Sequence, residues 1–225
     1  MSGIGEHRLI TVEGPIGVGK TSLARRLAEH LDAELLLEDT ASNPFLERFY
    51  ADPKAVALPT QLHFLFERAR QFKALNQTDM FAPRRVADFL MEKDRLFARV
   101  NLDDDEYRLY EQVYAHLSVE IPVPDLVLYL QAPVEVLLER VQRRGVGFEQ
   151  GMDPDYLRRL AEAYANFFHH YEAAPLLIIN ATDIDLVNNE QDFLSLVEEA
   201  DRLQHGRHYF NPMAAAPGST VGSAS

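Results

Sequence analysis

Short apolar runs alternate with segments of helical periodicity along most of the chain. Consecutive apolar residues, a pattern typical of buried parallel strands, occur at residues 8–12, 34–38, 85–90, 125–130 and 176–179. Between these runs apolar residues recur at helical spacing, which predicts helices at 20–31, 45–50, 59–75, 103–118, 133–144, 154–172 and 189–204. Strands that alternate with helices predict an α/β fold, in which a parallel sheet of about five strands is flanked by helices.

The length and the end of the chain define the expected domain. A chain of 225 residues is long enough for one α/β domain with a full core. We assign residues 1–206 to this domain. Residues 207–225 are rich in Ala, Gly, Ser and Pro, which predicts a disordered C-terminal tail.

Composition excludes several classes of function. The net charge of −13 disfavours binding along a nucleic-acid backbone, which needs a broad basic face. The absence of cysteine excludes disulfides, zinc–thiolate sites and thiol catalysis. No apolar run approaches the roughly 18 residues of a membrane helix, and the first residues lack a signal-peptide core. We therefore expect a cytoplasmic protein with neither a nucleic-acid nor a membrane partner.

A glycine-rich stretch joins the first predicted strand to the first predicted helix. It reads Gly14-Pro15-Ile16-Gly17-Val18-Gly19-Lys20-Thr21, which matches the phosphate-binding pattern G-x-x-x-x-G-K-[ST] in its strand–loop–helix context. Backbone N–H groups of such a loop, together with the helix N-terminus, bind phosphate oxygens. Lys20 is expected to reach the β- and γ-phosphates, and the Thr21 hydroxyl to bind Mg²⁺. The stretch predicts binding of ATP with Mg²⁺.

Phosphate binding alone names no reaction, because GTPases, ATPases and small-molecule kinases share this loop. The chain lacks the guanine-reading N-K-x-D stretch of GTPases. A small-molecule kinase needs a base beside the acceptor hydroxyl, cations on the transferred phosphoryl group and a lid that excludes water. Glu38 at the end of the second strand, Arg95 after the third strand and the segment 140–151 supply these groups in turn.

These motifs, in this order, resemble the bacterial branch of the deoxynucleoside kinases over about residues 8–204. The matching pieces are the phosphate loop, Leu37-Glu38-Asp39, Tyr50 with Gln61 eleven residues on, Asp94-Arg95, and Arg144-Gly145 followed by Glu149-Gln150-Gly151. The resemblance implies a P-loop kinase fold with a helical lid and a homodimeric assembly. It also implies transfer of the γ-phosphoryl group of ATP to the 5′-hydroxyl of a 2′-deoxynucleoside in nucleotide salvage.

The resemblance also implies roles for individual residues. Glu38 matches the general base that takes the proton from the 5′-hydroxyl. Asp94 and Arg95 match the family's acid–arginine pair, in which the acid lies close to Mg²⁺ and the arginine contacts the 5′-oxygen and the phosphates. Tyr50 and Glu149 match the two side chains that hold the 3′-hydroxyl. The predicted catalytic set is therefore Lys20, Glu38, Asp94 and Arg95.

Base recognition is expected on the helix that carries Gln61 and Arg68, which lie seven residues apart and hence on one side of it. Gln61 matches the family's base-reading glutamine, whose amide can form two hydrogen bonds with a base edge. In deoxycytidine kinase an aspartate five residues after the catalytic arginine pairs with the helix arginine. The same count from Arg95 reaches Val100, a departure from that pattern. A purine base, deoxyadenosine first, is our expectation.

Three arginines, Arg140, Arg143 and Arg144, occur at helical spacing before a glycine-containing segment. Spacing of i, i+3 and i+4 places them on one helix face, where they can present three cations to the transferred phosphoryl group. The alternative is a basic helix end that stabilises its own dipole. By resemblance Arg140 and Arg144 match lid arginines, Arg143 can replace a third one, and Asp183 lies where relatives contact the adenine of ATP.

Two other functions remain open from the sequence. A nucleoside monophosphate kinase of the thymidylate type also has a phosphate loop, and it would need cations such as Arg48 or Arg68 for the acceptor phosphate. A non-catalytic nucleotide-binding subunit would keep the fold for assembly only. The joint presence of Lys20, Thr21, Glu38, Asp94 and Arg95 argues against the second alternative.

Overall fold

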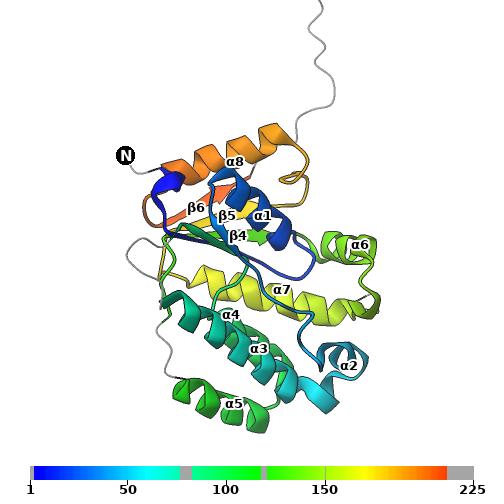
Figure 1. Ribbon diagram of the computed structural model, residues 1–225. Helices are drawn as coiled ribbons and strands as arrows, with labels where there is room; N and C mark the ends of the chain where they lie inside the picture. The colour runs from blue at the N-terminus through cyan, green and yellow to red at the C-terminus, as the bar shows by residue number, and fades with distance from the viewer. Residues whose placement is uncertain (1–2, 77–82, 118–120, 150, 212–225) are drawn as a thin grey trace, which may run out of the picture.

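A parallel sheet of six strands forms the centre of the molecule, in the order β2-β3-β1-β4-β5-β6 (Figure 1). The computed structural model describes residues 3–76, 83–117, 121–149 and 151–211. The strands are β1 (Leu9–Glu13), β2 (Glu34–Leu36), β3 (Arg85–Ala87), β4 (Leu126–Gln131), β5 (Leu176–Asn180) and β6 (Arg207–Phe210). The predicted α/β class with a parallel sheet is confirmed.

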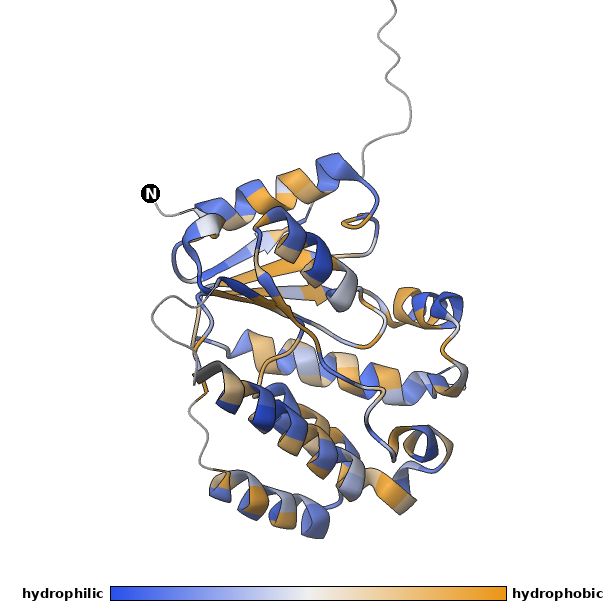
Figure 2. Ribbon diagram, in the orientation of Figure 1, coloured by the Kyte–Doolittle hydropathy of each residue, from blue (hydrophilic) through white to orange (hydrophobic). Residues whose placement is uncertain are grey.

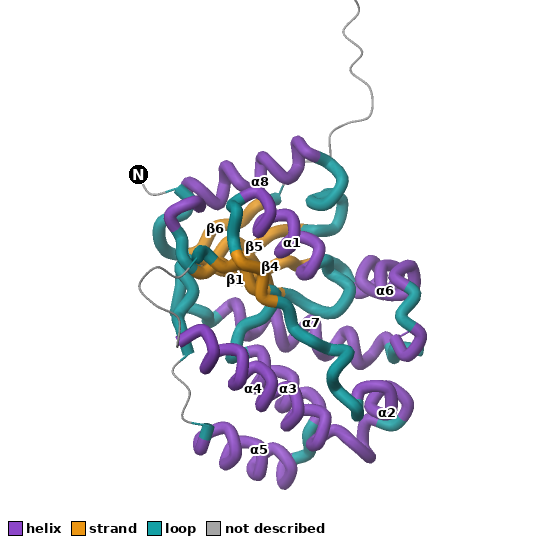
Figure 3. Tube along the Cα trace, viewed as in Figure 1, coloured by secondary structure: helices purple, strands orange, loops and turns teal. Residues whose placement is uncertain are grey.

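Helices cover both faces of this sheet. They are α1 (Lys20–His30), α2 (Leu46–Ala51), α3 (Pro53–Asn76), α4 (Lys93–Asn101), α5 (Asp104–His116), α6 (Val134–Arg144), α7 (Pro154–His169) and α8 (Glu190–Arg202), with short 3₁₀ turns η1 (Ile4–Glu6) and η2 (Gly147–Glu149). Figure 3 shows α1 and α8 on one side of the strands and α7, α4 and α3 on the other. None of the helices within these described residues is both long and apolar enough to cross a membrane.

The apolar runs of the sequence form the core of the sheet. Strands β1 and β4 are buried along their length except for Gln131, and Figure 2 shows β4 and β5 as mostly apolar ribbons between helices of mixed hydropathy. The inward face of α7 packs on β4, where the rings of Phe168 and Tyr129 stack with centroids 4.2 Å apart. Burial on both faces of the sheet explains why these strands are continuously apolar rather than alternating.

The sixth strand extends the sheet beyond residue 206, where the sequence places the end of the domain. Residues 207–210 belong to the predicted tail, but they form β6, which pairs in parallel with β5 at the edge of the sheet. An edge strand with both faces partly in solvent needs no apolar run, and the stretch Arg-His-Tyr-Phe has none. Residues 212–225, the rest of the predicted tail, lie outside the described residues.

The segment after the third strand differs most from the prediction. The expected strand at 85–90 ends at Ala87 in the structure, and helix α4 begins six residues later. The buried face of α4 includes Lys93 and Asp94, so charged residues interrupt the apolar periodicity that would have revealed the helix. Because successive residues on a helix point about 100° apart, the side chains of Lys93, Asp94 and Arg95 point in different directions from α4.

A substitution in the phosphate loop tests the close packing of this loop on α6. Gly17 has φ +85°, and a Cβ at this position would lie 2.7 Å from the Leu137 carbonyl oxygen. We expect Gly17→Ala to lower the free energy of unfolding by about 2 kcal/mol or more, through backbone strain and the clash. Thermal melting without nucleotide should show a drop of several degrees.

Gly147→Ala is the matched control, because a Cβ there meets no atom within 4 Å and the backbone lies outside the left-handed region. Equal melting temperatures for the two variants would contradict the expected clash.

Candidate active site

A cavity of about 1090 Å³ opens beside the phosphate loop and contains most of the predicted site residues. Those that line it are Ile16, Gly17, Val18, Gly19, Lys20, Thr21, Glu38, Tyr50, Gln61, Arg68, Arg140, Arg143, Arg144, Glu149 and Asp183. Gly14 and Pro15 form the base of the loop instead: the Gly14 N–H donates to the Glu13 carboxylate, and the Pro15 carbonyl accepts from Lys20 Nζ at 3.1 Å.

Lys20 is positioned by the loop and by the charges around it. Gly19, with φ +107°, turns the chain into the first residue of α1, which places Lys20 at the helix N-terminus. Burial and then the neighbouring charge of Lys93 lower the pKa of Lys20 to about 8. Glu13 below the loop is fully buried, and its carboxylate also accepts from the Leu90 N–H at 2.8 Å and the Tyr164 hydroxyl at 3.1 Å.

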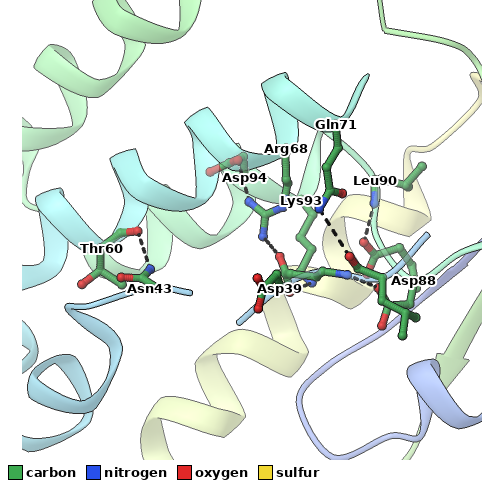
Figure 4. Close-up of polar contacts among 12 residues, drawn as sticks. Asp39, Asn43, Thr60, Arg68, Gln71, Asp88, Leu90, Lys93 and Asp94 are labelled. Atoms are coloured by element: carbon green, nitrogen blue, oxygen red, sulfur yellow. Dashed lines mark hydrogen bonds and ion pairs between the residues drawn. The ribbon is translucent and has the colours of Figure 1, made fainter. Parts of the chain in front are cut away.

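Glu38, the predicted general base, lies two residues beyond β2 and is held by two cations. Its Oε1 is paired with Arg68 from α3, and its Oε2 accepts from Lys93 Nζ of α4 at 2.9 Å. Burial opposes ionisation, but the charges of Arg68 and Lys93 outweigh it and lower the pKa of Glu38 to about 2. Figure 4 shows Arg68 reaching between Asp94 and the segment that carries Asp39. The carboxylate is therefore ionised across the physiological pH range.

Asp94 and Arg95, for which the sequence predicts catalytic roles, lie outside the lining of the cavity. Asp94 is fully buried and pairs with Arg68 at 2.5 Å. Arg95 points towards α5, where it pairs with Glu111 at 3.1 Å and lies 4.1 Å from the ring centroid of Tyr114. Since α4 is a helix, two adjacent residues cannot both face the phosphate loop.

Asp88 occupies the position that was predicted for Asp94. It is the first residue after β3, its Oδ2 accepts from the Thr21 hydroxyl at 2.6 Å, and its Oδ1 accepts from the Glu38 N–H at 2.8 Å. A polar residue directly after a buried parallel strand was the available sequence signal, and the overlong strand prediction at 85–90 hid it.

The residues beside the phosphate loop suit Mg²⁺ that binds together with a nucleotide, rather than a metal ion held by protein side chains alone. No group of three or more His, Asp or Glu side chains gathers as a metal site within the described parts of the chain. One hydroxyl and one carboxylate match the way Mg²⁺ binds with nucleotides, where phosphates and water supply the other ligands.

Arg68 has an acidic partner in the structure, although the sequence count did not find one. The sequence count from Arg95 reached Val100, but the structure pairs Arg68 with Asp94, which is five residues after Phe89. Burial alone would lower the pKa of Arg68, whereas Asp94 and Glu38 raise it. The guanidinium of Arg68 therefore links α3, which carries Gln61, to Glu38.

The far end of the cavity presents polar groups among aromatic rings. Tyr50 stacks on Phe148 with centroids 5.5 Å apart, and Glu149 pairs with Arg144 from the end of α6. Gln61 is 2% exposed, and its Oε1 has no hydrogen-bond partner although it lines the cavity. A buried amide oxygen without a partner is costly, so a ligand with an N–H donor fits there.

The three arginines of α6, for which the resemblance implies a lid role, differ in their contacts. Arg140 donates to the carbonyl oxygens of Ala181 at 2.7 Å and Thr182 at 3.2 Å, and so ties α6 to the loop after β5. Arg143 and Arg144 are exposed and line the cavity. Arg143 and Arg144 are long cationic side chains at the mouth of the cavity, where they can bind a phosphate group over the loop.

Comparison with known proteins agrees with this geometry. Residues 10–205 match the family description "Deoxynucleoside kinase". A deoxyadenosine kinase of Lactobacillus acidophilus is 31% identical over 86% of this chain and 95% of its own length. A deoxyguanosine kinase of Bacillus subtilis is 29% identical over 86% of this chain and 96% of its own length. The fold is similar to that of an M. mycoides deoxyadenosine kinase with bound dATP, with a TM-score of 0.73, 23% identity and coverage of 85% and 98% of the two chains.

Proposed function

The chain belongs to the deoxynucleoside kinase family, and from this premise we propose that its cavity brings MgATP together with a purine 2′-deoxynucleoside. As a kinase of this family it transfers a phosphoryl group from ATP to the 5′-hydroxyl of a deoxynucleoside. The observation that carries the site assignment is the position of Glu38, which lies in one cavity with Lys20 and Thr21.

The proposed reaction starts with the 5′-hydroxyl beside Glu38. The carboxylate accepts the proton while the 5′-oxygen attacks the γ-phosphorus, and the bond from phosphorus to the leaving ADP oxygen breaks. Lys20 at the N-terminus of α1 stabilises charge on the β- and γ-phosphates. Thr21 and Asp88 are the residues that would hold Mg²⁺, which neutralises negative charge on the phosphates when it is bound with ATP.

We assign the acceptor to the end of the cavity that contains Tyr50, Gln61 and Glu149. The Tyr50 hydroxyl and the Glu149 carboxylate hold the 3′-hydroxyl of the sugar, and the Gln61 amide reads the base. Its unpartnered Oε1 suits the exocyclic amino group of adenine, to which a side-chain amide can bind in a bidentate manner. Relatives named deoxyadenosine and deoxyguanosine kinases also support a purine, with deoxyadenosine first.

The arrangement of cations does not favour a monophosphate acceptor. Arg68 is committed to two buried carboxylates, Glu38 and Asp94. Arg48 lies over the ring of Phe45, 5.3 Å from its centroid, and does not line the cavity. Neither arginine is thus available for an acceptor phosphate, as a thymidylate-type kinase would require.

ADP release with MgATP tests the acceptor directly. The panel contains the four natural deoxynucleosides, adenosine and thymidine monophosphate. We expect the fastest turnover with deoxyadenosine or deoxyguanosine, and little with adenosine or the monophosphate. Turnover with the monophosphate alone would move the assignment to the monophosphate kinases, and preference for a pyrimidine would refute the proposed base choice.

Tyr50→Phe tests the assignment of the 3′-hydroxyl. The variant keeps the ring that stacks on Phe148 and removes only the hydroxyl. Loss of one hydrogen bond of about 0.5–1.5 kcal/mol should lower kcat/KM for the deoxynucleoside by about two- to tenfold. The value for the matching 2′,3′-dideoxynucleoside, which lacks the 3′-hydroxyl, should stay the same. An equal loss with both acceptors would place the Tyr50 hydroxyl elsewhere.

We also propose that the enzyme works in nucleotide salvage in the cytoplasm, as a homodimer. Phe66 on α3 and Leu109 on α5 are 50% and 48% exposed, which supports a helical interface on that side of the molecule. Light scattering of the purified chain would distinguish a dimer from a monomer.

A further inference from the structure

The residue after Asp88 carries no charge. The family resemblance predicts an arginine directly after the acid that follows the third strand, where it would contact the 5′-oxygen and the phosphates. Phe89 occupies this position; it is 1% exposed and packs edge-to-face on Phe72 with centroids 5.4 Å apart. Arg95, the next arginine after this position in the sequence, is turned away towards α5. Neither the residue that follows Asp88 nor Arg95 therefore places a positive charge in the cavity.

Lys93 brings a positive charge to the same region from a different element. It is the first residue of α4, its side chain is 5% exposed, and it lines the cavity. Its Nζ donates to Glu38 Oε2 at 2.9 Å. Burial alone would lower the pKa of Lys93, but the charges of Glu38 and Glu13 outweigh burial and raise it. The ammonium group therefore stays charged at neutral pH.

Lys93 lies between the acceptor side and the donor side of the cavity. On one side it touches Glu38, and on the other its charge acts on Lys20 and on Glu13 beneath the phosphate loop. Figure 4 shows Lys93 and Arg68 approaching the residues around Asp39 from α4 and α3. Arg68 is fixed by its second carboxylate, Asp94, whereas Lys93 has Glu38 as its ion-pair partner.

We propose that Lys93 is a catalytic residue that donates hydrogen bonds to the 5′-oxygen and to the transferred phosphoryl group, in place of the arginine that Phe89 replaces. This role rests on the proposed kinase function. An ammonium group has three N–H donors, so it can hold the phosphoryl oxygens while it remains beside Glu38.

A change of hydrogen-bond partner at Lys93 would also prepare Glu38 as the general base. Without substrate both carboxylate oxygens of Glu38 are occupied, Oε1 by Arg68 and Oε2 by Lys93. When the substrates bind, Lys93 stays beside Glu38 but directs its N–H donors to the 5′-oxygen and the γ-phosphoryl oxygens, so Oε2 becomes free to accept the 5′-hydroxyl proton. The proton goes to Glu38, the new bond forms between the 5′-oxygen and phosphorus, and ADP leaves with the electron pair of the broken bond.

Lys93→Met and Lys93→Arg test this role, with Lys54→Met at an exposed position of α3 as the matched control. Removing a donor aimed at developing charge should lower kcat by about 10²- to 10³-fold in Lys93→Met. The KM for the deoxynucleoside and the equilibrium affinity for ATP should change only a few-fold. Lys93→Arg should recover part of the rate, and Lys54→Met should match the wild type.

Chemical rescue separates catalysis from folding. In Lys93→Ala, added ethylammonium should restore kcat in a saturable manner, while the melting temperature shows that the variant is folded. If wild type is active but Lys93→Met keeps kcat within threefold, or ethylammonium restores nothing in folded Lys93→Ala, the role of Lys93 is refuted and the kinase function stands. Wild type that turns over no deoxynucleoside would refute both.

Discussion

Glu38→Gln is expected to lower kcat by about 10²- to 10⁴-fold, the range that a positioned general base contributes. The substitution keeps the shape of the side chain, but an amide cannot take the 5′-hydroxyl proton. It leaves the phosphate loop and Lys20 unchanged, so equilibrium binding of ATP should stay within a few-fold of wild type. Single-turnover kinetics with saturating deoxynucleoside measure the chemical step directly.

Asp39→Asn is the control for this substitution. Asp39, three residues beyond the end of β2, also carries a carboxylate, but it is exposed and its side chain accepts from the Ser42 N–H at 3.2 Å. Its variant should turn over at close to the wild-type rate. Equal losses in the two variants would mean that the charge at this strand end, rather than the proton transfer, determines the rate.

Stability gives a second measurement for Glu38, with a definite sign. Its pKa is lowered in the folded protein to about 2 by Arg68 and Lys93, below the value of about 4.3 for an unperturbed glutamate. A lowered folded-state pKa contributes stability above the unfolded pKa, and that contribution is lost as the pH falls towards 2. Glu38→Gln should therefore be less stable at neutral pH, and the difference from wild type should shrink in acid.

The sheet and the phosphate loop follow from local patterns in the sequence. Buried parallel strands are continuously apolar, and the loop G-x-x-x-x-G-K-[ST] determines its own strand–loop–helix context. β6 escapes this reasoning because its stability comes from pairing with β5 rather than from its own apolar residues. Pairing at the edge of a sheet imposes no hydrophobic periodicity on the sequence, so the pattern of apolar residues does not predict this strand.

The acid–arginine pair shows where motif reasoning fails. Asp94-Arg95 has the right residue types in the right order, but the pair lies on a helix whose geometry turns Asp94 to Arg68 and Arg95 to Glu111. Asp88 reaches Thr21 because β3 ends one residue before it. The assignment depends on where the side chains of Asp88, Asp94 and Arg95 point. This follows from the end of β3 and the start of α4, which the spacing of residues in the sequence does not reveal.

Asp88→Asn and Arg95→Gln together test the corrected assignment. Asp88 is 4% exposed, and Asn keeps its shape while removing the charge beside Thr21. If the carboxylate helps to hold Mg²⁺, several kcal/mol of charge stabilisation are lost, which corresponds to about a thousandfold or more in kcat. The Mg²⁺ concentration that gives half-maximal rate should also rise.

Arg95→Gln should leave kcat and the Mg²⁺ dependence within about twofold of wild type. Its side chain is 48% exposed, and its pair with Glu111 and its contact with Tyr114 lie away from the cavity. An exposed ion pair contributes about 0.2–1 kcal/mol, so the variant should lose only a little stability. Asp94→Asn should instead lower the melting temperature, because it leaves buried Arg68 with one carboxylate, without changing the Mg²⁺ requirement. A large loss of activity in Arg95→Gln with normal turnover in Asp88→Asn would restore the sequence-based pair and remove Asp88 from the site.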